Sequence, residues 1–542
     1  MKGERAALSL LAIAFLAIHL QIFLFPNGFF AFLHADEIDV LMARAEVRAG
    51  QPLVLTHPAG KPDEGGAAAL AYLLAPLPLD DPRAATVVLR LTAIALAGAT
   101  LALWTRFWRR TLGGRAGLVP ALLWLFPQEG WISVTIQLQA PYAVSALAAA
   151  LAANLALPFL RDGGRCSAAM LGGLGAALGA LTILCPGAAP ACVASAAVVA
   201  LGGERAREKV RAAAVLFASA CVAVLVLIAL EWAARGESPL PMLASWALRS
   251  GGEAGRSGWY ERPLLALTNL FAPGRVWLMG WALFDVLVLV VVLRRWLAPR
   301  GDALAGRAME IHESAAVLTL ASHLVTRFAA SASYSIVPVL PHLVGLAGAA
   351  LAGALGIGAP HGAPPSRRRT LTRAAAVGFV AWWVGSGAGA FEERFARRDL
   401  DLAYPGIAVA RLVAPRLAER PPAPIASTMH WALPLAIHRP DRPSCCIPRS
   451  ICEVGCEPGF FHGGAGTFVL PGPAAHPHGE PQALGFAARL AEAAHEGGVA
   501  LAIEVAGADG EWRSVSAIPP DALAVIAEAA NGDRALDALL GP

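Results

Sequence analysis

Residues 6–25 read AALSLLAIAFLAIHLQIFLF, and residues 32–50 read FLHADEIDVLMARAEVRAG. The first stretch carries no Asp, Glu, Lys or Arg and matches the roughly 20 residues that a helix needs to cross a bilayer. The second stretch opens with Asp36, Glu37 and Asp39 close together. The chain is therefore predicted to cross a membrane and then to place a group of carboxylates on the far side.

The apolar stretch at residues 6–25 is predicted to be a retained transmembrane span and not a cleaved signal peptide. Lys2 and Arg5 precede it, as basic residues precede the apolar part of a signal peptide. Its end, FLFPNGFF at residues 23–30, lacks the small-residue pattern of a cleavage site, and many further apolar stretches follow. We interpret it as the first of several spans.

The composition agrees with this interpretation. Of 542 residues, 56% are hydrophobic and only 15% are charged, and the mean hydropathy is +0.57. A soluble protein of this size needs far more polar surface. The formal net charge of +4 gives no reason to expect a nucleic-acid partner. The sequence indicates an α-helical polytopic membrane protein in contact with membrane lipids.

Six short basic clusters set the predicted topology, because short cytoplasmic loops collect Lys and Arg. Enough apolar sequence for two crossings separates each cluster from the next, so all of them can lie in the cytoplasm. This gives ten spans, and residues 373–390 provide an eleventh. The clusters are Lys2 and Arg5; Arg106, Arg109, Arg110 and Arg115; Arg161 and Arg165; Arg205, Arg207, Lys209 and Arg211; Arg294, Arg295, Arg300 and Arg307; and Arg367, Arg368, Arg369 and Arg373.

The domain organisation follows from this topology. Residues 1–391 form a transmembrane domain whose N-terminus is cytoplasmic, and residues 34–83 form its first outer loop. Residues 392–542 form an extracytoplasmic domain. The Ala-, Gly- and Arg-rich composition is typical of a bacterial chain, so the predicted location is the bacterial cytoplasmic (inner) membrane.

The tail is predicted to be a small α/β domain. Its runs PAPIAST, GTFVLP and VALAIEVAG are typical of strands, and helical patterns lie between them. Four of the eight cysteines fall in one short segment of this tail, at Cys445, Cys446, Cys452 and Cys456. In an oxidising compartment these four favour two disulfides, although a zinc site that includes His462 is the alternative.

The acidic stretch itself predicts an amphipathic helix at the outer membrane surface. Ile38, Leu41, Met42 and Ala45 recur at helical spacing, and Gly50 supplies a stop. The acids stand in its first turn, where carboxylates commonly cap a helix and complement its dipole. A structural role therefore explains them as well as a catalytic role does.

Further motifs favour the catalytic role. THPAGKPDEGG lies in the same outer loop, AATVVLRL opens the second span, and HLVTRFAASASYSIVPVLPHL covers the ninth and tenth spans. In this order and topology, they resemble the GT-C membrane glycosyltransferases that use polyprenyl-phosphate sugars. The resemblance covers roughly residues 10–350. The pattern is most similar to the protein O-mannosyltransferase and lipid A aminoarabinose transferase group and to the lipopolysaccharide-core sugar transferases.

The resemblance implies a role for each matching position. Asp36 and Glu37 match an acidic motif in the first outer loop. Lys61 and Pro62 match the start of a Lys-Pro-Pro-Leu motif, from which this chain departs at Asp63 and Glu64. The remaining matches are Arg90 with Leu91, and Arg327, Tyr334, Pro338 and Pro341.

These residue types suit the chemistry of sugar transfer. An acceptor hydroxyl that attacks an anomeric carbon needs a base, for which Asp36 is preferred and Glu37 is its partner or substitute. The departing lipid phosphate gains negative charge, which Lys61, Arg90 and Arg327 can stabilise. His57 and Tyr334 are expected to line the substrate groove.

Each candidate has an alternative explanation. Arg90 can snorkel to headgroups, Arg327 can pair with an acid between helices, and Lys61 can be a solvated loop charge. His57 can be an ordinary loop histidine and Tyr334 part of an interfacial aromatic belt. Asp36 and Asp39 share a helix face and with His34 provide a candidate site for a divalent metal.

The sequence therefore predicts an inverting glycosyltransferase. It moves a sugar from a polyprenyl-phosphate donor to a hydroxyl of a glycan, lipid or protein acceptor on the outer face of the membrane. One rival is a transporter or flippase of lipid-linked sugars, but transporters tend to show repeated halves and ionisable groups near mid-membrane. A second rival is a scaffold whose tail binds an envelope partner.

Overall fold

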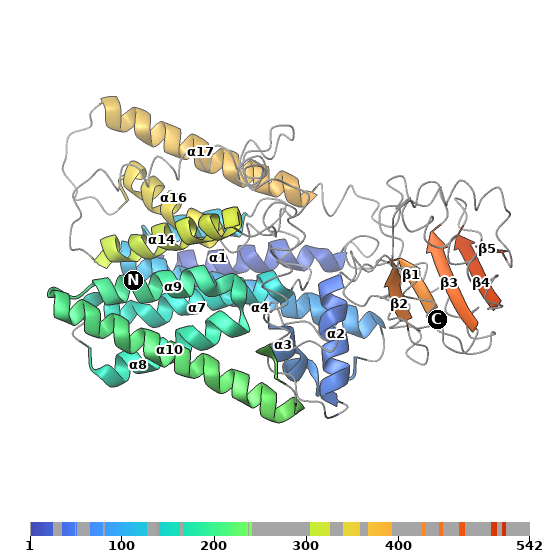
Figure 1. The fold of residues 1–542 in the computed structure, drawn as a ribbon. Helices are drawn as coiled ribbons and strands as arrows, with labels where there is room; N and C mark the ends of the chain where they lie inside the picture. The colour runs from blue at the N-terminus through green and yellow to red at the C-terminus, as the bar shows by residue number, and fades with distance from the viewer. Residues whose placement is uncertain are drawn as a thin grey trace. The chain divides into compact units, whose positions relative to one another are not determined.

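The computed structural model describes most of the helical part of the chain and the strands of its tail (Figure 1). The described residues are 2–24, 35–48, 50, 66–79, 82–126, 138, 140–162, 166–236, 238–240, 304–325, 340–357, 367–392, 425–428, 444–447, 465–471, 500–506 and 512–515.

The chain divides into two compact units. The first comprises Met1–Gln21, Val40–Leu77 and Leu89–Ala396. The second comprises Ile22–Asp39, Pro78–Val88 and Arg397–Pro542.

The helices follow the apolar segments of the sequence. They are α1 (Lys2–Leu20), α2 (Ala35–Arg48), α3 (Ala67–Leu74), α4 (Pro82–Leu112), α5 (Leu118–Leu125), α7 (Ala140–Asp162), α8 (Ala168–Leu184), α9 (Ala189–Leu201), α10 (Ala206–Arg235), α14 (Leu304–Val325), α16 (Leu340–Leu355) and α17 (Arg367–Glu392), with short 3-10 helices at Gln21–Leu24 and Pro186–Ala188.

Three of the described helices are long and apolar enough to cross a membrane. They comprise Ala84–Leu112 in α4, Ala140–Leu160 in α7 and Ala206–Ala234 in α10. Shorter apolar helices occupy Ala168–Leu184, Pro186–Leu201 and Leu340–Leu355. These helices agree with a polytopic membrane protein, and the count of eleven spans stays a prediction.

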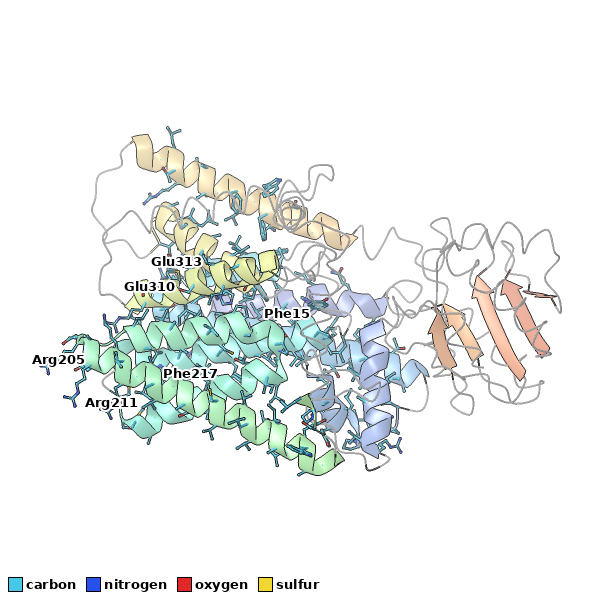
Figure 2. All side chains as sticks on the ribbon, in the orientation of Figure 1. Phe15, Arg205, Arg211, Phe217, Glu310 and Glu313 are labelled. Atoms are coloured by element: carbon cyan, nitrogen blue, oxygen red, sulfur yellow. The ribbon has the colours of Figure 1, made fainter. Side chains whose placement is uncertain are left out.

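Helix α10 has the surface expected of a helix in contact with lipid. Phe217 is 74% exposed, and Val222, Leu225 and Leu230 are also exposed. Arg205 and Arg211 mark the basic N-terminal end of this helix (Figure 2). An exposed apolar face with cations at one end is the pattern of a span that ends at a headgroup layer.

Glycines allow α8 and α10 to pack closely along their length (Figure 1). A Cβ added at Gly179 would lie 2.6 Å from both Cα and the carbonyl oxygen of Ala220. A Cβ added at Gly175 would lie 2.4 Å from the carbonyl oxygen of Leu216. Small residues at such interfaces are a common way for membrane helices to associate.

Replacement of Gly179 by Val is therefore expected to lower the stability of the bundle. Because the added side chain meets backbone, the helices must separate, and overpacking of this kind costs about 1–3 kcal/mol. Gly173→Val is the matched control, since a Cβ at Gly173 meets nothing within 4 Å. Thermal unfolding in detergent should show a lower Tm for Gly179→Val than for Gly173→Val. Equal values would contradict this packing.

A buried hydrogen-bonded network links α4, α14 and α16. The indole N–H of Trp108 donates to Nε2 of His312 at 3.0 Å, and Nδ1 of His312 lies 3.0 Å from Nδ1 of His342. An indole N–H can only donate, so Nε2 of His312 is unprotonated. The neutral ring then carries its proton on Nδ1 and donates to His342. A Cβ at Gly345 would lie 2.7 Å from Nε2 of His312, so only glycine fits there.

The described strands of the tail form one sheet in the order β2-β1-β3-β4-β5. They are β1 (Ile425–Thr428), β2 (Ser444–Ile447), β3 (Ala465–Pro471), β4 (Ala500–Ala506) and β5 (Trp512–Val515). The first four are parallel and β5 is antiparallel to β4.

The three sequence runs predicted as strands are confirmed as β1, β3 and β4. In register, Ile425 pairs with Ser444 on β2 and with Thr467 on β3. Parallel strands need long crossover connections, which are usually helices. The helices predicted between these strands lie outside the described residues, so the α/β class of the tail stays a prediction.

Candidate functional site

The predicted acidic helix is confirmed as α2, which begins at Ala35. Asp36, Glu37 and Asp39 stand in its first five residues, where carboxylates interact favourably with the helix dipole. The helix ends at Arg48, and Gly50 follows with a φ of 85°, as expected for its predicted role as a stop. The structure thus places Asp36 and Glu37 side by side in one helical turn.

Glu37 is fully buried, with an exposed fraction of 0%. A carboxylate that only capped a surface helix would stay in water, because transfer of a charge out of water is costly unless it is paired. Burial therefore separates Glu37 from an ordinary solvated capping acid, and its catalytic role stays a prediction. Among the acids of this turn, the structure describes the side-chain environment of Glu37 only.

The second half of α2 packs on α3. Ala43 forms a small apolar core with Ala68 and Ala71, and Val47 packs against its edge. Val40 is fully buried one turn earlier in the helix. By helix geometry, these residues lie on the opposite face of α2 from the apolar positions that the sequence pattern singles out.

A second charged side chain is buried on α2. Arg44 is 5% exposed, and its Nε donates a hydrogen bond to the carbonyl oxygen of Leu74 at 3.1 Å. Its terminal nitrogen donates to the carbonyl oxygen of Leu77. Sequence reasoning missed Arg44, because an arginine two turns into an amphipathic helix is ordinarily a surface charge. Arg44 follows Glu37 by two turns on the same helix face, and this spacing is the only feature of the sequence that could have indicated its burial.

Arg90 lies in α4, six residues after the start of the apolar segment at Ala84. Its exposed fraction is 0%, and it is among the largest fully buried side chains described. A side chain that snorkels reaches headgroups outside the protein. The enclosed position of Arg90 disagrees with snorkelling, and its functional role stays a prediction.

Asp36 and Glu37 share a turn of α2 and belong to the second compact unit, whereas Arg90 lies on α4 and belongs to the first.

The other predicted site residues fall in the strands of the tail or outside the described residues. Cys445 and Cys446 lie in β2. His34, His57, Lys61, Arg327, Tyr334, Cys452, Cys456 and His462 lie outside the described residues.

A metal site is not supported within the described part of the chain. No group of three or more His, Cys, Asp or Glu side chains comes together there in a way that could hold a metal ion. The set of Asp36, Asp39 and His34 is not tested by this observation, because His34 lies outside that part.

Comparison with solved structures identifies the fold. The chain is similar to ArnT from Cupriavidus metallidurans bound to undecaprenyl phosphate, with a TM-score of 0.52, 14% identity, and coverage of 91% of this chain and 93% of ArnT. The apo state of the same protein gives a TM-score of 0.51 and 15% identity, and covers 91% of this chain and 92% of ArnT.

A second protein shares this arrangement. The archaeal oligosaccharyltransferase AglB from Archaeoglobus fulgidus, in complex with an inhibitory peptide and a dolichol-phosphate, gives a TM-score of 0.50 and 12% identity, and covers 95% of this chain and 75% of AglB. No protein-family model matches the sequence, and comparison with curated protein sequences finds no match either. ArnT and AglB are both GT-C glycosyltransferases, and this chain has their fold.

Proposed function

We propose that this protein is a membrane glycosyltransferase that moves a sugar from a polyprenyl-phosphate donor to an acceptor hydroxyl. The observation that carries the proposal is the GT-C fold together with a pair of acids in the first turn of α2. The structurally similar ArnT and AglB bind undecaprenyl phosphate and a dolichol-phosphate, respectively. A lipid carrier explains why such an enzyme is a membrane protein: the lipid tail stays in the bilayer while the sugar reaches the outer loop.

The proposed reaction is a single displacement. The acceptor oxygen forms a bond to the anomeric carbon as the bond from that carbon to the phosphate oxygen breaks, so the anomeric centre inverts. The acceptor proton passes to a carboxylate, and the bonding electron pair leaves with the phosphate. Asp36 is the proposed base. Adjacent residues of a helix point about 100° apart, so Glu37 supports Asp36 rather than acting as a second base.

Basic residues are proposed to hold the donor phosphate. Arg90 is fully buried, and a cation in such a site stabilises developing negative charge more strongly than one in water. Lys61 and Arg327 complete the proposed set. His57 and Tyr334 are proposed to line the groove for the donor lipid and the sugar.

The proposed topology has eleven spans with a cytoplasmic N-terminus in a bacterial inner membrane. Residues 392–542 then lie outside the cytoplasm, where Cys445, Cys446, Cys452 and Cys456 form two disulfides. The acceptor is a glycan, lipid or protein hydroxyl on that side.

A reconstituted assay tests this function. Purified protein in proteoliposomes is supplied with undecaprenyl phosphate carrying a radiolabelled hexose or aminopentose, together with an envelope extract as acceptor. We expect label in a covalent product and release of one undecaprenyl phosphate for each sugar moved. Movement of labelled donor between leaflets without product would instead show a transporter.

A further inference from the structure

Arg44 forms hydrogen bonds that connect α2 to the C-terminal end of α3. Its guanidinium lies between α2, which carries it, and the C-terminal end of α3, where Leu74 is the last helical residue. The carbonyl groups of a final helical turn have no partner within the helix. Pro76 and Pro78 follow this turn, and neither has an N–H group to donate. The N–H of Leu77 donates to the carbonyl oxygen of Leu74 at 3.1 Å. Arg44 adds a second donor to that oxygen and also donates to the carbonyl oxygen of Leu77.

The planar guanidinium makes this contact directional. The Nε and the terminal nitrogen of Arg44 each donate to a different carbonyl oxygen, those of Leu74 and Leu77. Two donors in a rigid fork fix both the distance and the rotation of α2 relative to α3, which a single ammonium donor does not. The small core of Ala43, Ala68 and Ala71 provides close packing but no polar group that would fix the rotation of the helix.

The rotation of α2 about its own axis determines where its carboxylates point. Asp36 and Glu37 stand two turns before Arg44 in the same continuous helix. The direction in which each carboxylate points is therefore set by the same rotation that Arg44 fixes. Displacement of a catalytic group by about 1 Å can lower an enzymatic rate by roughly 100-fold.

We propose that Arg44 is a positioning residue: through its hydrogen bonds to Leu74 and Leu77, it sets the orientation of the α2 carboxylates. This inference rests on the proposed function, because it assigns the orientation of α2 a catalytic consequence. Arg44 acts through the helix and does not contact the substrate. Its removal should lower kcat and leave donor affinity unchanged.

Three variants test the proposal. Arg44→Met keeps a long apolar side chain but removes both donors, and Arg44→Lys keeps the charge and a single donor group. Arg48→Met is the matched control, because Arg48 is an exposed arginine at the end of the same helix. For each variant, the measurements are kcat, donor KM, Tm, and hydrogen exchange of the α2 amides.

We expect Arg44→Met to lower kcat by about 100-fold with an unchanged donor KM and faster amide exchange in α2. Arg44→Lys should recover part of kcat, and Arg48→Met should match wild type in every measurement. A merely structural role would lower Tm and the amount of folded protein while the kcat of the folded fraction stayed at the wild-type value.

The results distinguish a failure of the positioning role of Arg44 from a failure of the proposed transferase function. If wild type transfers sugar and Arg44→Met has the wild-type kcat, the positioning role is wrong and the function stands. If Arg44→Met raises donor KM and leaves kcat unchanged, Arg44 belongs to donor binding and the inference is also overturned. If wild type transfers nothing from the donor, the proposed function falls and the inference falls with it.

Discussion

Replacement of Asp36 by Asn is expected to remove transfer activity almost completely while leaving the fold intact. The carboxamide has nearly the same shape as the carboxylate but cannot take the proton of the acceptor hydroxyl. General base catalysis commonly contributes about 10²- to 10⁴-fold to a rate, so a loss of that size is expected. Single-turnover transfer from preloaded donor, measured for purified variants of equal Tm, checks it directly.

Two neighbouring substitutions give this experiment its controls. Asp39→Asn is isosteric and lies in the same part of α2, so it should keep near wild-type turnover. A loss in Asp39→Asn equal to that in Asp36→Asn would indicate the divalent-metal alternative instead. Glu37→Gln should lower the rate less than Asp36→Asn, although it changes a fully buried group and will also lower Tm. Full turnover in Asp36→Asn would defeat the assignment of the base.

Replacement of Arg90 by Met is expected to produce the second largest effect. Removal of one group that stabilises developing negative charge typically lowers kcat by about 10²- to 10³-fold. Arg90→Lys should recover only part of the activity, because an ammonium does not reproduce the planar fork of a guanidinium. Titration with undecaprenyl phosphate should show weaker binding to Arg90→Met than to wild type.

The control for Arg90 is a cation on the same helix. Arg106 is exposed near the other end of α4, and Arg106→Met should bind undecaprenyl phosphate as wild type does. Arg90 is completely enclosed, so Tm is measured for every variant. A folded Arg90→Met protein with wild-type affinity for undecaprenyl phosphate and wild-type kcat would show that Arg90 has a purely structural role.

The sequence predicted the elements whose signals are local. The apolar run after Ala84 predicted the span in α4, and residues 36–50 predicted α2 through helical spacing and a terminal glycine. The runs at β1, β3 and β4 predicted strands through β-branched and apolar residues. Hydrophobic periodicity reports such elements reliably, because it depends only on near neighbours in the chain.

Contacts between distant residues could not be predicted in the same way. Arg44 and Leu74 are 30 positions apart, as are His312 and His342, and no spacing rule links them. The need for glycine at Gly179 follows from its neighbour on α10 rather than from any feature of α8 itself. For the candidate site, the clustering of the acids and the place of Arg90 in an apolar run made them candidates, and their roles stay predictions. The burial of Glu37 and Arg90 became evident only in the structure.

The central claim is that sugar leaves a polyprenyl phosphate and becomes covalently attached to an acceptor. Mass spectrometry of membrane lipids and envelope glycoconjugates tests it whichever sugar is moved. The strains compared are the source organism, a strain lacking this chain, and that strain complemented with wild type or with Asp36→Asn. We predict that the deletion strain accumulates one polyprenyl-phosphate sugar and loses the same sugar from one glycoconjugate, and that wild type, but not Asp36→Asn, reverses both changes. Unchanged lipid and glycoconjugate profiles, or equal rescue by Asp36→Asn, would contradict the account.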